Sequence, residues 1–195
     1  MNETRPGAIR CFAAIALPQS VKQALAPAQR RLAASGPKAS WVALDQLHLT
    51  LRFLGEVPDE LAADYANRMG DALAAVPSFG LRVCGVGCFP NPTEPRVVWA
   101  GVEGETNALK TVAAIAEREA VAAGCSPEPR AFQAHITLGR IRDTWDLGSF
   151  PHALENQRSL DAGDFSVRRV TLYESRLRRG GPTYVKLEDF PLGHG

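Results

Sequence analysis

The chain has 195 residues, enough for one large domain or two small lobes with a sizeable buried core. Hydrophobic residues make up 45% and charged residues 22%, which is ordinary for a soluble globular protein. The formal net charge of +1 excludes an overall polycation that binds long duplexes by phosphate neutralisation alone.

The first half of the chain predicts two strand–helix pairs. A buried strand is expected at 10–18, followed by a helix at 21–36 that Pro27 should kink or split. Residues 40–58 are predicted as a second strand and 58–77 as a second helix. The apolar run after Arg10 is too short to span a membrane and lacks a signal-peptide cleavage region, so we expect a cytoplasmic protein with no membrane partner.

The middle of the chain predicts three strands and one helix. Alternating apolar residues indicate strands at 79–90 and 96–104, separated by a proline-rich turn at 90–95. The clearest helix follows at 105–124 and ends at a glycine. Another strand is expected at 134–143.

The C-terminal part predicts a loop with a short helix at 144–164, then two strands joined by the hairpin turn RRGGP. The order of elements repeats once along the chain, which indicates an α+β protein of two pseudo-symmetric lobes. We expect each lobe to be an antiparallel sheet with helices on its outer side. Residues 1–195 then form a single domain whose lobes enclose a central cleft.

Two of the four histidines belong to the same four-letter pattern. HLTL occupies residues 48–51 and HITL residues 135–138, each inside a predicted strand. Because side chains alternate along a strand, His48 and Thr50 share one face, and His135 and Thr137 share one face of theirs. The opposite faces carry Leu49 and Leu51 in the first motif, and Ile136 and Leu138 in the second.

The paired motif suits in-line attack on a phosphodiester. Imidazole has a pKa of about 6.5, so one histidine can act as base while the other acts as acid. Threonine hydroxyls beside them can donate hydrogen bonds to phosphate oxygens. One such motif alone would be read as a buried structural histidine; two copies in similar strands favour catalysis. His152 and His194 have no threonine two residues later and are expected to be surface residues.

Several longer stretches resemble one known family. The stretches LHLTLRFLGEV, GCFPNPTEPRVVWAGVEG and FQAHITLGRI, with the tail LYESRLRRGGPTYVKLEDFPL, are similar to the 2H phosphoesterase superfamily. In detail they resemble its RNA 2′,3′-cyclic phosphodiesterases, the bacterial and archaeal family historically called 2′-5′ RNA ligases. The resemblance covers nearly the whole chain.

The resemblance implies a role for each motif residue. His48 is the implied proton donor and His135 the implied proton acceptor, while Thr50 and Thr137 bind the phosphate. Water attacks the cyclic phosphate, the P–O3′ bond breaks, and a 2′-phosphomonoester results. No metal or other cofactor is expected, and the implied substrates are RNA ends or cyclic nucleotides. We expect a monomer.

Two arginines are candidates for binding the phosphate. The family tends to have a phosphate-contacting arginine shortly after the second motif, at the position of Arg140. Strict alternation puts Arg140 on the apolar face, so either Gly139 allows a bulge or the strand has ended there. Arg52 falls directly on the His48 and Thr50 face by the same alternation and is the second candidate.

Weaker candidates lie outside the motifs. Phe12 is a candidate for stacking on a nucleobase, although a core position is the commoner role for such a residue. Any one of Tyr173, Glu174 and Ser175 is placed to orient an imidazole. The basic hairpin with Arg176, Arg178 and Arg179 either guides RNA phosphates or is a solvated turn.

Two alternative functions remain. The same site could join RNA ends by 2′-5′ ligation or hydrolyse another cyclic or 2′-5′ nucleotide. A non-catalytic module that binds RNA ends is less favoured, because binding alone requires neither an acid nor a base.

Overall fold

The computed structural model describes residues 7–178 and 181–193. In chain order the elements are β1 (Ala8–Ala16), α1 (Gln19–Ala34), β2 (Ala39–Trp41), the 3₁₀ turn η1 (Leu44–Gln46), β3 (His48–Pro58), α2 (Asp59–Leu73), β4 (Phe79–Phe89), β5 (Val97–Gly104), α3 (Thr106–Ala122), β6 (Ile136–Ile141), α4 (Phe150–Glu155), β7 (Asp161–Val167), β8 (Arg169–Arg178) and β9 (Gly181–Pro191). The predicted α+β class is confirmed.

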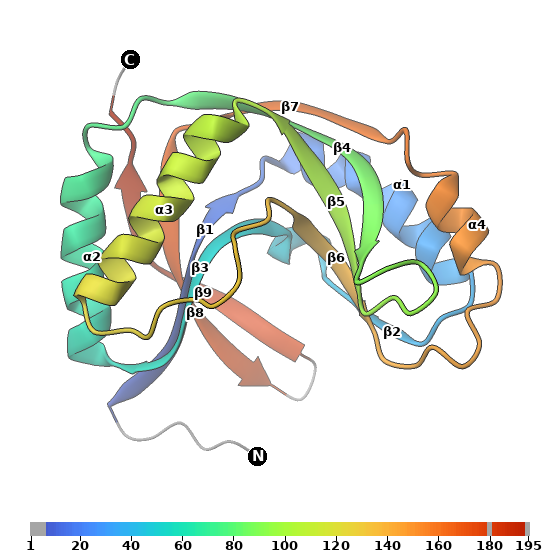
Figure 1. Ribbon diagram of the computed structural model, residues 1–195, viewed down its shortest axis with the longest axis horizontal. Coiled ribbons are helices and arrows are strands. Elements are labelled where there is room, and N and C mark those ends of the chain that lie inside the picture. Colours follow the sequence, from blue (N-terminus) through green and yellow to red (C-terminus); the bar gives the residue numbers. More distant parts are fainter. Residues whose placement is uncertain (1–6, 179–180, 194–195) are drawn as a thin grey trace.

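The strands form one curled antiparallel sheet with the order β7-β4-β5-β6-β3-β1-β8-β9, and β2 pairs with the far part of β6 (Figure 1). Strands β1, β3, β8 and β9 make one lobe, and β4, β5, β6 and β7 make the other. The lobes join where β3 meets β6, at the single registered pair Leu49 and Ile136. The two strands that carry the motifs are therefore neighbours at the centre of the sheet.

The helices cover the outer side of both lobes. Helices α2 and α3 pack together against the first lobe, where α3 contacts β3. Helices α1 and α4 lie on the opposite side of the molecule, with α1 packed against β7 (Figure 1). Helix α1 thus follows a strand of one lobe and packs on the other lobe, so the two lobes do not correspond to two separable halves of the chain.

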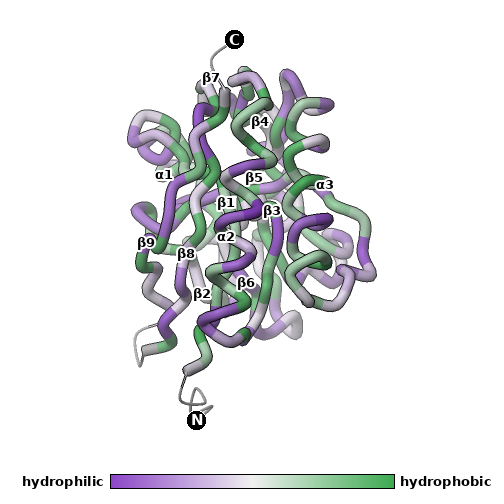
Figure 2. The backbone as a smooth tube through the Cα atoms, turned by 90° about the vertical axis from the view of Figure 1, so that its left-hand side faces the viewer, coloured by the Kyte–Doolittle hydropathy of each residue, from purple (hydrophilic) through white to green (hydrophobic). Residues whose placement is uncertain are grey.

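The buried faces of the elements explain where they form. Along the tube in Figure 2, hydrophobic and hydrophilic residues alternate within strands and helices, as expected for elements with one buried face. Leu49, Ile136 and Leu138 are fully buried at the centre of the core. Helix α3 ends as predicted, because Gly124 adopts φ 107° just beyond it. No helix in the described part of the chain is both long and apolar enough to span a bilayer.

Two predicted elements differ from the structure. Residues 40–58 are not one strand, because β2 and the 3₁₀ turn η1 precede β3. The polypeptide leaves the edge of β6 after Trp41 and turns before it pairs with β1 as β3. Pro27 does not split the first helix, which runs unbroken from Gln19 to Ala34.

The four cysteines are free thiols. Cys11 and Cys88 are buried, while Cys84 and Cys125 are half-buried. Burial raises the pKa of Cys11 to about 12, so this thiol stays neutral at physiological pH. The cysteines act as small, largely apolar residues in the packing.

Candidate active site

The two motifs meet around a local twofold axis. Leu49 of β3 pairs with Ile136 of β6 in antiparallel register, and both side chains are fully buried on the core side. Extending that register by one residue each way puts Thr50 opposite His135 and His48 opposite Thr137. All four of these side chains are half-buried, on the face opposite the core. The pairing therefore brings both imidazoles and both hydroxyls to one concave surface.

Both imidazoles are oriented by the same kind of contact. Nδ1 of His48 lies 2.7 Å from the carbonyl oxygen of Gln46, and Nδ1 of His135 lies 2.8 Å from that of Gln133. Because a carbonyl oxygen only accepts, each Nδ1 carries a proton and donates it to the residue two positions earlier. Each Nε2 is then the nitrogen that exchanges protons with a substrate.

Each motif strand bulges at the same position of the motif. Between β1 and β3, Ala14 pairs with Thr50 and Ala13 with Arg52, so Leu51 is the extra residue. Between β5 and β6, Trp99 pairs with Thr137 and Val98 with Gly139, so Leu138 is the extra residue. Both bulges reverse the alternation of side chains beyond the motif. The fifth residue after each histidine, Phe53 or Arg140, consequently faces the concave side.

Arg140 lies beside the motif residues. Its exposed side chain lines the same pocket as Thr50 and His135, and its positive charge acts on His48. The expected bulge is present, although at Leu138 and not at Gly139. Gly139 is required for a different reason: a Cβ there would lie 2.6 Å from Cε3 of Trp41. The glycine lets β2 pack closely against the bulged strand.

Arg52 does not share the face of His48 and Thr50, because the Leu51 bulge turns it away. It is only 8% exposed, and its Nε lies 2.5 Å from a carboxylate oxygen of Glu117 on α3. Its guanidinium also donates to the carbonyl oxygens of Phe53 and Ser126, both at 2.5 Å. Alternation predicts a phosphate contact for Arg52, and Arg52 does line the same pocket as Thr50 and His135. Its guanidinium, however, links β3 to α3 and to the segment after it.

Phe12 is buried against the imidazole of His48 and does not face a ligand. The side chain is 1% exposed, with its ring centroid 4.8 Å from that of His48. The ring of Phe12 is also surrounded by three other aromatic rings with centroids 5.0–5.5 Å from its own, those of Phe53, Tyr173 and Tyr184. The proposed stacking role of Phe12 is thus corrected to that of a support for His48. Phe53, 48% exposed, is the most exposed ring of this group.

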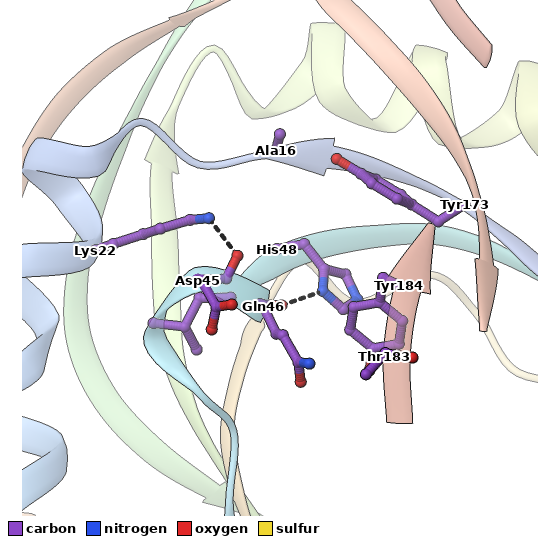
Figure 3. Close-up of a pocket in the computed structure, with 9 residues that line it drawn as sticks. Ala16, Lys22, Asp45, Gln46, His48, Tyr173, Thr183 and Tyr184 are labelled. Carbon is purple, nitrogen blue, oxygen red and sulfur yellow. Dashed lines mark hydrogen bonds between the residues drawn. The ribbon is translucent and has the colours of Figure 1, made fainter. Parts of the chain in front are cut away.

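A small pocket of about 230 Å³ lies beside His48 (Figure 3). Its walls are the rings of Tyr173 and Tyr184, the side chain of Gln46, and Lys22 from the first turn of α1. Nζ of Lys22 donates to the carbonyl oxygen of Asp45 at 2.7 Å. Of the three residues considered for orienting an imidazole, only Tyr173 lines this pocket.

A larger pocket of about 950 Å³ opens on the side of His135. Thr50, Phe53 and Arg140 line it from the sheet, and Phe132 lines it from the segment that precedes His135. Phe89 contributes a ring whose centroid is 5.3 Å from that of His135, in an edge-on arrangement. The pair of histidines therefore has a pocket on each side, the smaller beside His48 and the larger beside His135.

The surroundings of His48 lower its pKa below the usual 6.5. Burial is the main cause, because it disfavours the charged imidazolium. The hydrogen bond to Gln46 acts in the opposite direction, while the positive charges of Lys22, His135 and Arg140 lower the pKa further. An anionic phosphate at this site would reverse the effect of those charges.

Sequence reasoning missed Lys22, Tyr184 and the paired glutamine positions. Gln46 and Gln133 both precede their histidine by two residues, so the repeated pattern is QxHxTL and not only HxTL. That longer repeat was visible in the sequence. Lys22 and Tyr184 come from distant elements, and no local pattern marks them.

Of the three arginines in the C-terminal hairpin, the structure describes the side chain of Arg176. Arg176 forms an ion pair of 2.8 Å with Glu174. Arg179 and the side chain of Arg178 lie outside the described residues. His152 is exposed on α4, as expected, and His194 is also outside the described part of the chain.

Comparison with known proteins gives consistent matches over most of the chain. The family model described as LigT like Phosphoesterase matches twice, over residues 15–99 and 101–184. The RNA 2′,3′-cyclic phosphodiesterase of Aeropyrum pernix is 34% identical over 163 residues, 84% of this chain and 92% of that protein. The protein of the same name from Thermus thermophilus is 35% identical, covering 94% and 90%. The crystal structure of E. coli LigT complexed with 3′-AMP has a TM-score of 0.76 at 29% identity, covering 95% and 98%.

Proposed function

Because the chain belongs to the LigT-like phosphoesterases, the 2H family, we propose that it hydrolyses RNA 2′,3′-cyclic phosphate ends to 2′-phosphomonoesters. The observation that carries this proposal is the antiparallel pairing of the two motifs about Leu49 and Ile136. That pairing supplies two imidazoles and two hydroxyls to one concave surface. The names of the curated relatives support the choice of substrate.

The reaction needs a base and an acid on opposite sides of the phosphorus. Nε2 of His135 takes a proton from water, whose oxygen attacks the phosphorus and forms the new P–O bond. The P–O3′ bond breaks, and His48 gives its proton to O3′. The hydroxyls of Thr50 and Thr137 and the guanidinium of Arg140 stabilise the charge on the non-bridging oxygens. Each histidine then exchanges one proton with solvent before the next turnover.

His48 must carry a proton to act as the acid, although its lowered pKa in the free protein favours the neutral imidazole. A substrate phosphate carries negative charge, which favours the imidazolium form that the lowered pKa of the free protein disfavours. Binding of the substrate thus helps to protonate the residue that must donate. The contact between Phe12 and the His48 ring fixes the direction in which that proton is delivered.

The test is turnover of a short oligonucleotide that ends in a 2′,3′-cyclic phosphate, with the product isomer identified by chromatography. His48→Ala and His135→Ala should each lower kcat by roughly 10²-fold or more, since one positioned proton transfer contributes about 10²–10⁴-fold. Circular dichroism and thermal unfolding confirm that each variant is folded. EDTA should leave the wild-type rate unchanged.

Full activity of either folded variant would exclude the two-histidine mechanism. A 3′-phosphate product would show that the other P–O bond breaks. Binding of the oligonucleotide without turnover would identify a binding module instead.

A second reaction, 2′-5′ ligation, is favoured by the second pocket. The pockets beside His48 and His135 flank the phosphate position, so each has room for part of a nucleoside. A 5′-hydroxyl in one pocket would then replace water as the nucleophile, or act as the leaving group in cleavage of a 2′-5′ linkage. Incubation with a 5′-hydroxyl acceptor tests this, because only ligation yields a longer product with a 2′-5′ bond.

A further inference from the structure

A basic strip continues from the proposed active site along the edge formed by β2 and β6. Ser40 of β2 pairs with Arg140 of β6, and the backbone N–H of Arg142 donates to the carbonyl oxygen of Lys38 at 2.8 Å. Lys38 and Arg142 are therefore neighbours, two residues beyond the pair that contains Arg140. Figure 1 shows β2 and β6 side by side at the edge of the second lobe.

The side chains of this strip share the face of the active site. Ile141 is buried in the core, whereas Arg140 and Arg142 on either side of it are exposed. Because side chains alternate along a strand, Arg140 and Arg142 point to the same side, about 7 Å apart along the backbone. Arg140 lines the pocket of His135, so Arg142 and Lys38 extend that charged surface outward.

The charges of the strip are available to a ligand. Among the described residues, no ion pair involves Lys38, Arg140 or Arg142. Two carboxylates follow closely in sequence and reduce the local positive charge. One oxygen of each accepts a backbone N–H of its own loop: Asp143 from Trp145 at 3.0 Å, and Asp146 from Gly148 at 2.9 Å.

Trp145 lies in that loop and is 96% exposed. A single exposed aromatic residue indicates nothing by itself. Here, however, the indole projects from a loop that is fixed to the end of α1, since the N–H of Ser149 donates to the carbonyl oxygen of Ser35 at 3.0 Å. Trp145 follows Arg142 by three residues, so one short segment carries both an exposed indole and an unpaired cation. Proteins bind single-stranded nucleic acid with these two features, by stacking on bases and contacting phosphates.

We infer that the outer part of this surface binds the nucleotides that precede the terminal cyclic phosphate in a single-stranded RNA. We call this outer part, formed by Lys38, Arg142 and Trp145, the basic edge. The inference rests on the proposed function, because it takes the terminal phosphate to lie between His48 and His135. The next phosphates toward the 5′ end then pass Arg140 and reach Arg142 and Lys38, while one base stacks on Trp145. Single-stranded RNA 3′ ends several nucleotides long are accordingly the preferred substrates over cyclic mononucleotides.

The test compares a 2′,3′-cyclic mononucleotide with a short oligonucleotide that has the same terminal nucleotide. The variants are Lys38→Ala/Arg142→Ala and Trp145→Ala, none of which removes a motif residue. The matched control is Arg30→Ala, an exposed arginine on the outer helix α1. For the oligonucleotide, Trp145→Ala should raise KM about fivefold or more, because one base loses its stacking contact with the indole.

The charge variant has a distinctive signature. Its KM for the oligonucleotide should depend less on salt, with the slope against log salt reduced by about 0.7 for each lost phosphate contact. The mononucleotide parameters should not change in any variant. Arg30→Ala should behave as wild type with both substrates.

Three results would overturn the inference: equal effects on both substrates, an unchanged oligonucleotide KM, or the same effect from Arg30→Ala. Those results leave the proposed function intact as long as the wild type hydrolyses the mononucleotide. If the wild type hydrolyses neither substrate, the proposed function fails. Fluorescence anisotropy of the labelled oligonucleotide then tests the basic edge by binding alone, and unchanged binding in both variants would reject it.

Discussion

Arg52 shows how one side chain can appear catalytic in the sequence and be structural in the fold. Counting alternate residues from His48 places Arg52 with the motif, yet the Leu51 bulge moves it into contact with Glu117. Glu128 lies near the same guanidinium at 3.8 Å, and its backbone N–H donates to Glu117 at 2.9 Å. Arg52 thereby fixes the segment that leads from α3 to Gln133 and His135.

Replacing Arg52 tests this structural role. Arg52→Ala should destabilise the protein by about 2 kcal/mol, because Glu117 and two backbone carbonyls lose their partner; the partial exposure of Glu117 keeps the cost below that of a fully buried pair. Urea unfolding of Arg52→Ala, Glu117→Ala and the double variant measures the coupling between the two residues. A variant of unchanged stability whose KM alone rises would instead indicate the phosphate contact that alternation predicts.

At the scale of strands and helices, periodicity predicts most elements but not how strands pair. Hydrophobic spacing correctly indicates α2, β4, β5 and α3, because each buries one face along its length. The bulges at Leu51 and Leu138 depend on the neighbouring strands, β1 and β5, so nothing within the motif reveals them. The misfit of Arg140 with strict alternation was the one signal that a bulge exists.

Gly139 provides a test of the bulged strand as an element. Gly139→Ala puts a methyl group 2.6 Å from Cε3 of Trp41, so the indole or one of the strands β2 and β6 must move. We expect a loss of about 1–3 kcal/mol in stability and a lower kcat, since Arg140 is the next residue. Thermal unfolding and turnover of a cyclic nucleotide measure the two effects.

Two further variants control that experiment. Gly70→Ala in α2 meets nothing within 4 Å and should leave activity unchanged while stabilising the helix slightly. The pair Gly139→Ala/Trp41→Ala removes the clash and should recover part of kcat. Wild-type kcat in Gly139→Ala would show that Arg140 is positioned without this close packing.

At the scale of the whole molecule, the proposed site exists only where the two lobes join. One lobe supplies His48 and Thr50, and the other supplies His135 and Thr137, across the single β3–β6 pair. Helix α1, which begins next to the first lobe, packs on the second. We therefore propose that residues 1–195 act as one domain. The doubled motif predicted that two lobes would cooperate, but the sequence has no signal for the crossing of α1.

The coupling of the two lobes predicts an unusual pH dependence. Burial and the charges of Lys22, His135 and Arg140 lower the pKa of His48 below 6.5 in the free protein. Because the acid must be protonated, kcat/KM should fall as the pH rises through this lowered pKa. Bound phosphate raises that pKa, so kcat should fall only at higher pH. In the unfolded chain the pKa of His48 is higher than in the folded protein. His48 therefore lowers stability as the pH drops from the unfolded-state pKa to the folded-state pKa.

NMR titration of the His48 ring, with and without inorganic phosphate, measures its pKa in the free and in the phosphate-bound protein. Lys22→Met should raise the value in the free protein by removing a nearby positive charge. A midpoint at or above 6.5 in the free wild type would contradict this account of the site.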